Sequence, residues 1–325
     1  MEQKRNVSID IGRAIAAYSV ITLHIGIPTL TSYFNALARF AIPYFFMISG
    51  YFAHSGSVKQ RIKKLFFLYL GAEAVYFIYY LFNGLYDRLQ VETRDIIELL
   101  FYNTPLFYGP AWFLLSMIYI YLIIDVTQKL KFRKILYLLI PVLILWLWLW
   151  QRLQTLTDIS FRRGDFKILV AIPFFGVGYL IKDKETLLFD KISNIALKLL
   201  MGIGIVLTIA ERMILNLFTS DIYELYIGTV IFVVALFIYV CRNPIVNMPF
   251  LSYVGKNLSE YIYIFHMMVY MIMYKWVGRP DTICLWASIT VVSWGIYHAK
   301  KWTKNGINSF LKKNNGGCEN GGNCY

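Results

Sequence analysis

Long apolar stretches recur along almost the whole chain and are separated by short polar segments. A helix needs about 20 apolar residues to cross the roughly 30 Å hydrocarbon core of a bilayer. The second stretch, which contains Arg39 and Pro43, and the sixth, which contains Pro173, are short and interrupted. The pattern predicts an all-α fold, a polytopic membrane protein with about ten transmembrane helices. The predicted spans are residues 10–30, 36–53, 65–87, 110–128, 134–151, 166–181, 193–214, 222–241, 259–276 and 281–299.

The composition supports this prediction and excludes an ordinary soluble domain. Of the 325 residues, 58% are hydrophobic and only 16% are charged, which is far from the balance of soluble proteins. No polar gap is long enough for a separate soluble domain, so we expect one transmembrane domain over residues 1–313. Residues 314–325 form a Gly/Asn-rich tail with two cysteines, which we expect to be disordered and to bind no metal.

The basic residues predict the topology. Lys and Arg outnumber Asp and Glu by 32 to 19. With the N-terminus in the cytoplasm, the inner loops carry 20 Lys or Arg and the outer loops carry 8. Cytoplasmic loops of membrane proteins carry this excess, so both termini are expected in the cytoplasm of a multi-pass protein of the cell membrane. Anionic membrane lipids account for the positive charge, and no nucleic-acid partner is expected.

The outer loops offer few groups that could bind a ligand. Residues 88–110 contain a short amphipathic segment, which predicts an interfacial helix on the outer side. Residues 151–167 concentrate the polar side chains, among them Arg163. We therefore place Arg163 among the residues expected to face an acceptor.

A few charged residues lie within predicted spans, where an unpaired charge costs about 2.5–3.5 kcal/mol or more. Arg39 and Arg212 are cations of this kind, whereas Lys198 lies near a helix start and can reach the interface. Glu211 directly precedes Arg212, so the two point to different helix faces. Structural pairing and a functional role both stay open for Glu211.

Arg13 and His24 are the polar residues of the first span that most need an explanation. They are eleven residues apart, which places both on one face of a helix about 16 Å apart along its axis. Asp10 lies one turn before Arg13 and can neutralise it. Arg61 and Lys64, at the start of the third span, face the same compartment as Arg13. This basic cluster could bind phosphates or contact lipid headgroups, and a buried histidine can be structural or catalytic.

Five segments, in order along the chain, resemble the acyltransferase 3 family of membrane-bound acyl transferases. The first is "DIGRAIAAYSVITLH", with an Arg, ten residues and a His, which is similar to the opening of that family. The others are "ARFAIPYFFMISGYF", "QRIKKL", "AWFLLSMIYIYL" and "GKNLSEYIYIFH". The resemblance covers nearly the whole chain.

The resemblance implies transfer of an acyl group, usually acetyl from acetyl-CoA, to a hydroxyl of an extracytoplasmic saccharide or related acceptor. By resemblance, Arg13, Arg61 and Lys64 would bind the acyl-CoA. His24 would act as general base or as a transient acyl carrier. The residues expected to line the cavity or its acceptor side are Asp10, Arg39, Trp112, Arg163, Glu211 and His266. The acceptor would be a glycan or a lipid-linked sugar of the cell envelope.

The chain departs from the family in two ways. Glu260 follows Ser259 where relatives more often have an aromatic residue. Many relatives carry an added esterase-like domain that this sequence does not show, so transfer is expected to be direct or to use a separate extracytoplasmic transferase. The chain also resembles the membrane part of the serine racemases of vancomycin-resistance systems. The alternative function is therefore a transporter-like module that admits a small molecule such as serine.

Overall fold

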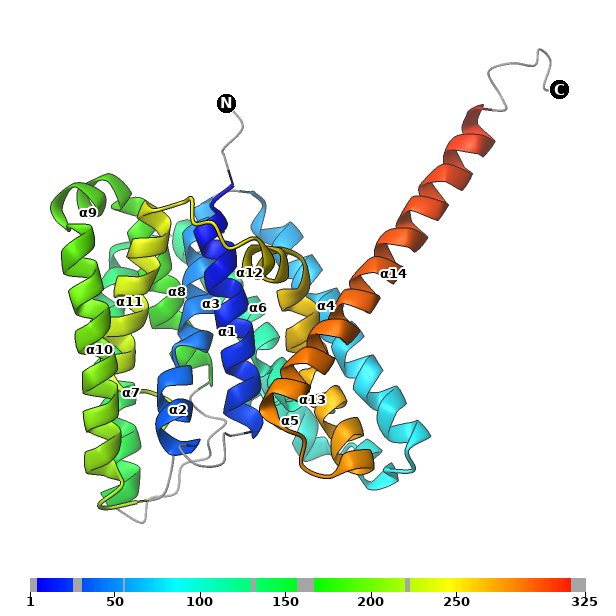
Figure 1. The fold of residues 1–325 in the computed structure, drawn as a ribbon, viewed down its shortest axis with the longest axis horizontal. Coiled ribbons are helices and arrows are strands. Elements are labelled where there is room, and N and C mark those ends of the chain that lie inside the picture. Colours follow the sequence, from blue (N-terminus) through cyan, green and yellow to red (C-terminus); the bar gives the residue numbers. More distant parts are fainter. Residues whose placement is uncertain are drawn as a thin grey trace.

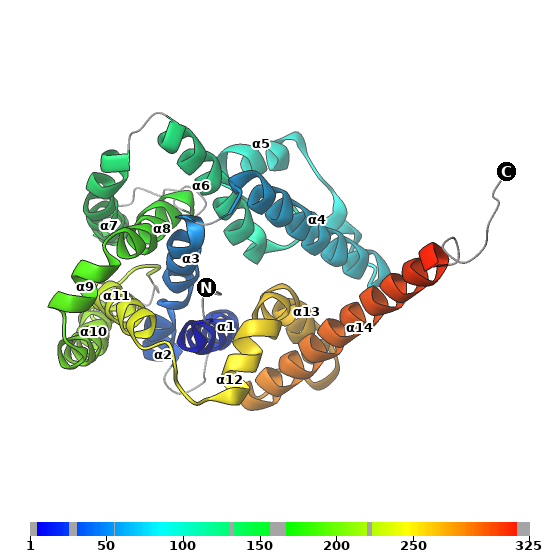
Figure 2. The ribbon, with the colours of Figure 1, turned by 90° about the horizontal axis from the view of Figure 1, so that it is seen from above.

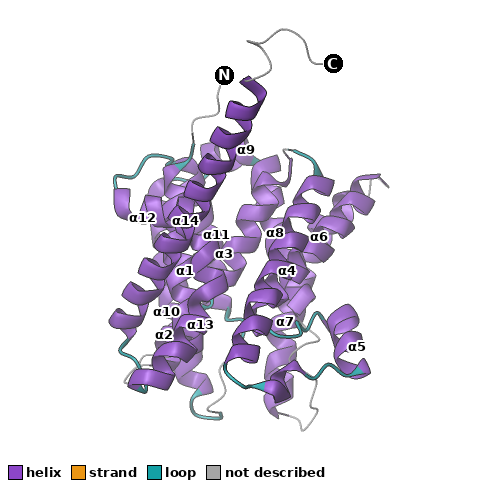
Figure 3. Cartoon of the chain, turned by 90° about the vertical axis from the view of Figure 1, so that its right-hand side faces the viewer, coloured by secondary structure: helices purple, strands orange, loops and turns teal. Residues whose placement is uncertain are grey.

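The fold is helical throughout the part of the chain that the structure describes, with no strand in those residues (Figure 3). The structure is a computed structural model, and it describes residues 5–25, 31–54, 56–129, 133–156, 167–219 and 223–316. The prediction of an all-α fold is confirmed. The longer helices are α1 (Val7–Ile25), α3 (Ala41–Tyr51), α4 (Val58–Phe82), α6 (Trp112–Lys129), α7 (Arg133–Leu156), α8 (Lys167–Asp183), α10 (Asn194–Leu215), α11 (Ile227–Arg242), α13 (Ser259–Val277) and α14 (Thr282–Gly316).

Short helical segments connect these helices. They are α2 (Thr31–Ala38), η1 (Phe52–His54), η2 (Tyr86–Leu89), α5 (Thr93–Tyr102), η3 (Gly109–Ala111), α9 (Glu185–Lys191), α12 (Pro249–Tyr253) and η5 (Val254–Leu258). The helix α5 is the one expected in residues 88–110, and its apolar side chains Ile96, Leu100 and Phe101 are exposed. An amphipathic helix with an exposed apolar side is suited to a membrane interface.

Each of the ten predicted spans coincides with a helix, but the helices differ in how well they suit a bilayer. Within the described residues, six helical stretches are long and apolar enough to cross a membrane: Ser32–His54, Val58–Phe82, Gly109–Thr127, Tyr137–Gln154, Asn194–Leu215 and Thr282–Gly306. The apolar helix α11 is shorter. These six stretches fit a membrane protein, while the expected total of ten crossings stays a prediction.

The interruption expected in the second span is present. Helix α2 ends at Ala38, a turn at Arg39 and Phe40 follows, and α3 begins at Ala41. Pro43 lies in the first turn of α3, where its missing N–H has no helical acceptor to lose. The break places the Arg39 side chain at the end of a helix rather than in the middle of an apolar one.

The ends of the helices form two opposite faces of the molecule (Figures 1 and 2). Helix α1 begins on the face that also carries α9 and α12 and towards which α14 extends, and we call it the N-terminal face. The opposite face carries α5 and the turn between α13 and α14. This division agrees with the loops predicted to be inner and outer. Which compartment each face meets stays a prediction.

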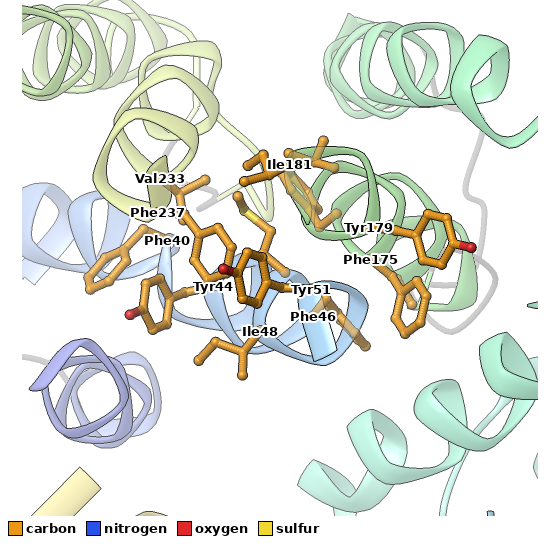
Figure 4. Packing of buried hydrophobic residues seen from close by; sticks show 14 of the residues in the cluster. Phe40, Tyr44, Phe46, Ile48, Tyr51, Phe175, Tyr179, Ile181, Val233 and Phe237 are labelled. Atoms are coloured by element: carbon orange, nitrogen blue, oxygen red, sulfur yellow. The ribbon is translucent and has the colours of Figure 1, made fainter. Parts of the chain in front are cut away.

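The largest core cluster lies where α3 packs against α8 and α11 (Figure 4). Phe46, Phe175 and Phe237 are fully buried there. Helices α3 and α8 approach so closely that a Cβ at Gly50 would overlap the carbonyl oxygen of Phe175. This packing fixes α3 beside α1, and α3 supplies lining residues to the cavities described below.

The C-terminal tail, predicted to begin at residue 314, begins later in the structure. Helix α14 continues to Gly316, so residues 314–316 are helical rather than irregular. The remaining tail, residues 317–325, lies outside the described residues.

Candidate active site

Helix α1 places Arg13 near the N-terminal face and His24 near the opposite face. A guanidinium nitrogen of Arg13 lies 3.4 Å from a carboxylate oxygen of Asp10, which confirms the expected neighbour. Arg5 holds the same carboxylate at 2.6 and 2.9 Å. Asp10 is thus a shared partner of two arginines at the N-terminal face.

A cavity of about 480 Å³ opens beside Arg13, and we call it the Arg13 cavity. Lys64 from α4 and Lys256 from η5 also line it. The ammonium nitrogen of Lys64 lies 3.5 Å from a carboxylate oxygen of Glu260, another lining residue. Three cations and one carboxylate give this cavity a net positive lining, which suits an anionic ligand.

The turn that carries Lys256 has π-helical hydrogen bonding over Val254–Leu258. Short π segments are often found at functional sites. Gly255 lies against α1 so closely that a Cβ there would overlap the carbonyl oxygen of Asp10. The absence of a side chain at Gly255 therefore lets η5 join α1 and α4 around one cavity.

Arg61 lies apart from the Arg13 cavity. Its guanidinium donates to the Tyr121 hydroxyl at 3.1 Å and to the carbonyl oxygen of Phe52. Phe52, Asp10 and Arg13 line a second cavity of about 390 Å³ on the N-terminal face. The structure thus brings Lys64 and Arg13 to one cavity, whereas Arg61 lines neither cavity and only contacts Phe52, a lining residue of the second.

On the opposite face, a cavity of about 300 Å³ is lined by Arg39, Trp112, Lys167 and Glu224, and we call it the Arg39 cavity. Arg39 and Glu224 form an ion pair. Arg39 also donates to the Asn35 side chain at 3.2 Å. This cavity offers an indole face together with donors and acceptors of hydrogen bonds.

The side chains of His24 and His266 meet between α1 and α13. Their ring centroids are 5.2 Å apart and the rings are inclined by 40°. His266 is fully buried, whereas His24 is accessible. Asn35 donates to the carbonyl oxygen of Leu23 at 3.3 Å and accepts from Arg39 at 3.2 Å. The end of α1 that carries His24 is therefore linked to Arg39, a lining residue of the Arg39 cavity.

The histidine pair is also linked to the Arg13 cavity. The carbonyl oxygen of Tyr263 lies 2.7 Å from Nδ1 of His266, and Tyr263 lines the Arg13 cavity. Phe113 lines the same cavity, and its neighbour Trp112 lines the Arg39 cavity. Two imidazoles thus lie between the Arg13 cavity on one face and the Arg39 cavity on the other.

The sequence of the chain matches the acyltransferase 3 family, described as an acyltransferase domain, over residues 6–297. The chain belongs to the acyltransferase 3 family. No curated protein and no solved structure matches it in the same comparisons. Membership implies an acyltransferase of the membrane, in agreement with the apolar helices, and both cavities and the histidine pair lie within the matched region.

Glu211 lines neither the Arg13 cavity nor the Arg39 cavity. Its carboxylate pairs with Arg152 and accepts hydrogen bonds from the Trp148 indole at 2.6 Å and the Ile227 backbone at 2.9 Å. These contacts join α7, α10 and α11, so the structure favours the pairing role for Glu211. Arg163, the other expected acceptor-side residue of this region, lies outside the described residues.

Several residues around the site were not singled out from the sequence. Glu224 was included in the span predicted at 222–241, but α11 begins at Ile227 and leaves Glu224 before the helix. Lys256 lies in a predicted inner loop, where it is one of the positive charges that predict the topology. Glu73 is a buried carboxylate on α4, only 6% exposed. Burying a charge in a membrane span is costly for a carboxylate as well as for a cation, and this argument singles out Glu73 from the sequence.

The described residues contain no group of three or more His, Cys, Asp or Glu side chains that could hold a metal ion. The side chains described above bring two imidazoles and several cations to the site. An imidazole can remove a proton from a hydroxyl as it attacks a thioester, and cations can bind phosphates.

Proposed function

We propose that this protein is an O-acyltransferase of the cell membrane that moves an acyl group, acetyl in the simplest case, from cytoplasmic acyl-CoA to a hydroxyl of an extracytoplasmic saccharide or related acceptor. One observation carries the proposal. The accessible His24 lies at the end of α1 that Asn35 links to Arg39 and so to the Arg39 cavity, and its ring contacts His266, which is linked through Tyr263 to the Arg13 cavity.

The Arg13 cavity supports the choice of acyl-CoA as donor. Phosphates form strong charge-assisted hydrogen bonds with Arg and Lys. Arg13, Lys64 and Lys256 can approach the diphosphate of CoA from three different helical segments. The Lys64–Glu260 pair is exposed, and such pairs contribute at most about 1 kcal/mol, so a phosphate can replace Glu260 at low cost.

His24 supplies the base for the transfer step. The neutral imidazole takes the proton of the acceptor hydroxyl as its oxygen attacks the thioester carbonyl carbon. The resulting tetrahedral intermediate collapses, the carbon–sulfur bond breaks, and the electron pair leaves with sulfur. The imidazolium returns its proton to that sulfur, so the products are an ester and CoA thiol and His24 is regenerated.

The Arg39 cavity supports a sugar-like acceptor. The indole of Trp112 offers a flat apolar face, while Arg39, Lys167 and Glu224 can bind hydroxyls or carboxylates. A glycan or a lipid-linked sugar of the cell envelope combines these features. The acyl group passes to it directly or through a separate extracytoplasmic transferase.

The test uses inverted membrane vesicles that contain the protein and are supplied with [¹⁴C]acetyl-CoA. We expect label to enter the extracted glycan and lipid fractions with wild type. His24→Ala should reduce this rate about 10²- to 10⁴-fold, because general-base catalysis typically contributes that much. Lys63→Ala, an exposed lysine beside Lys64, is the matched control.

Equal rates for wild type and His24→Ala would overturn the proposal, provided that both proteins unfold at the same temperature. Uptake of serine into proteoliposomes, with no label transferred from acetyl-CoA, would replace it with the transporter-like alternative.

A further inference from the structure

His266 is a second histidine at the site, and its surroundings are unusually well defined. It lies on α13, and its side chain is fully buried. Its ring packs against that of His24 with the centroids 5.2 Å apart. The two residues come from segments that are more than two hundred residues apart in the sequence.

The hydrogen bonds at Nδ1 determine which nitrogen of His266 carries the proton. Nδ1 lies 2.7 Å from the carbonyl oxygen of Tyr263 and 3.2 Å from that of Ile262. It also lies 3.4 Å from the hydroxyl of Tyr108, whose own hydrogen is donated to the Tyr263 carbonyl. A carbonyl oxygen can only accept, so Nδ1 must donate. In the neutral ring, Nε2 therefore has a lone pair and no hydrogen.

Nε2 of His266 is buried and has no hydrogen-bond partner among the described residues. Leaving a buried polar atom unsatisfied costs about 1–3 kcal/mol, and native structures contain few such atoms. The rings of Tyr108 and Tyr263 contact His266 with centroids 6.3 Å away, and the ring of His24 is nearer, at 5.2 Å. An acceptor thus lies ready next to the proposed catalytic base.

The structure holds His266 firmly in this position. The Tyr108 hydroxyl donates to the carbonyl oxygen of Tyr263, and the ring of Tyr108 stacks on Tyr76 with the centroids 4.2 Å apart. Tyr76 donates to the carbonyl oxygen of Ile264 at 2.9 Å. These contacts fix the turn of α13 on both sides of the Nδ1 acceptor.

The loop that carries Tyr108 is itself held by Glu73. The buried carboxylate accepts the backbone N–H groups of Phe107 at 2.7 Å and Tyr108 at 3.3 Å. Glu73 lies on α4, the helix that also supplies Lys64. A chain of contacts therefore leads from α4 through Tyr108 to His266.

We propose that His266 is a positioning residue: a turn of the His24 ring, which already contacts His266 without a hydrogen bond, lets Nε2 of His266 accept from one ring nitrogen of His24 and leaves the other nitrogen of His24 unprotonated and directed at the acceptor hydroxyl. When His24 takes the hydroxyl proton, its imidazolium keeps the hydrogen bond to Nε2. His266 keeps its own proton on Nδ1 throughout. The catalytic consequence rests on the proposed function, whereas the hydrogen bond itself does not.

The first experiment measures the nucleophilicity of His24 directly. Diethyl pyrocarbonate acylates the unprotonated nitrogen of an imidazole, and mass spectrometry quantifies its product at each histidine of the purified, detergent-solubilised protein. His266→Asn keeps a donor for the Tyr263 carbonyl and removes the acceptor at Nε2, while His266→Gln places an acceptor near Nε2. His298, which contacts the Tyr253 hydroxyl at 3.0 Å, is the internal control.

We expect His266→Asn to slow modification of His24 about two- to tenfold, the effect of losing one neutral hydrogen bond. His266→Gln should restore most of the rate, and the rate at His298 should not change. His266→Leu, which also lacks the acceptor, gives the same test if the Asn variant does not fold. Unchanged modification of His24 in a folded Asn or Leu variant would overturn the proposal.

The second experiment separates positioning from donor binding. In the vesicle assay with [¹⁴C]acetyl-CoA, His266→Asn should lower kcat and leave the KM for acetyl-CoA unchanged, because His266 does not line the Arg13 cavity. His266→Gln should recover part of kcat. If wild type transfers no label while His24 modification still depends on residue 266, the proposed function fails and the histidine pair stands.

Discussion

Arg13 and Lys64 approach one cavity from two helices and have weak partners there. Arg13 lies 3.4 Å from Asp10, which Arg5 approaches more closely. Lys64 lies 3.5 Å from Glu260, and its side chain is 74% exposed. An exposed pair such as Lys64–Glu260 contributes little to stability, and the buried Asp10 keeps its closer partner Arg5 when Arg13 turns away. Both cations can therefore turn to a phosphate without a large loss of folding free energy.

We expect Arg13→Ala and Lys64→Ala each to weaken acetyl-CoA binding about ten- to a hundredfold. This is the effect of losing a hydrogen bond between charged groups, worth about 1.5–3 kcal/mol. The measurement is the rise in unfolding temperature of the purified protein as the acetyl-CoA concentration increases.

Lys63→Ala is the control for this measurement and should behave as wild type, because Lys63 is exposed and does not line the cavity. A loss as large for Lys63→Ala as for Lys64→Ala would mean that general surface charge, rather than the cavity, attracts the ligand.

At the residue scale, the sequence revealed the candidates that break an apolar pattern. Arg13, His24 and Arg39 stand out because a polar group in an apolar span needs a reason. Glu224 does not stand out in the same way because it lies at the edge of its predicted span, and Lys256 does not because it lies in an ordinary polar connection. Only the packing of η5 on α1, and of the segment before α11 near Arg39, brings them to the cavities.

The π-helical segment η5 is the element that most directly shapes the Arg13 cavity. It packs on α1 through Gly255 and presents Lys256 and Asn257 to the cavity. The Ser259 hydroxyl donates to the carbonyl oxygen of Gly255 at 2.9 Å. The shape of the cavity therefore depends on a close approach of two backbones.

Gly255→Ala should lower the free energy of unfolding by about 1–3 kcal/mol, the usual cost of overpacking a tight contact. It should also weaken acetyl-CoA binding, since η5 must move away from α1. Thermal unfolding in detergent and the acetyl-CoA titration measure the two effects.

Gly295→Ala is the matched control, because a Cβ at Gly295 on α14 meets no atom within 4 Å. It should leave binding unchanged and keep or slightly raise stability, since alanine favours helix over glycine. Equal effects of the two substitutions would contradict the assignment of η5 to the cavity.

At the element scale, hydropathy predicted where helices lie better than where they begin. Helix α4 starts at Val58, seven residues before the predicted span, because the Ser57 side chain accepts the Gln60 N–H and caps the helix. Apolar length reports the thickness of a bilayer, whereas a helix continues until a cap or a turn ends it. The basic residues Arg61 and Lys64 are therefore helical.

At the scale of the whole molecule, the Arg13 cavity and the Arg39 cavity lie on opposite faces. The Arg13 cavity lies towards the start of α1 and the Arg39 cavity towards its end, and α3 lines both. The short helices α9 and α5 lie on the N-terminal and the opposite face (Figure 1). If the N-terminal face meets the cytoplasm, acyl-CoA has direct access to the cations.

Cysteine labelling tests this orientation. In a background with the four native cysteines replaced by serine, Arg94→Cys on α5 should react with an impermeant maleimide in intact cells. Lys184→Cys, just before α9, should react only after the membrane is opened. Both positions are exposed, so the reverse pattern would place the N-terminal face outside.

The most direct test of the account is a cryo-electron microscopy structure of the protein with a non-hydrolysable thioether analogue of acetyl-CoA. The account predicts the diphosphate between Arg13 and Lys64, and the acetyl group directed towards His24. Density for the analogue in the Arg39 cavity, or an acetyl group that ends far from His24, would contradict it.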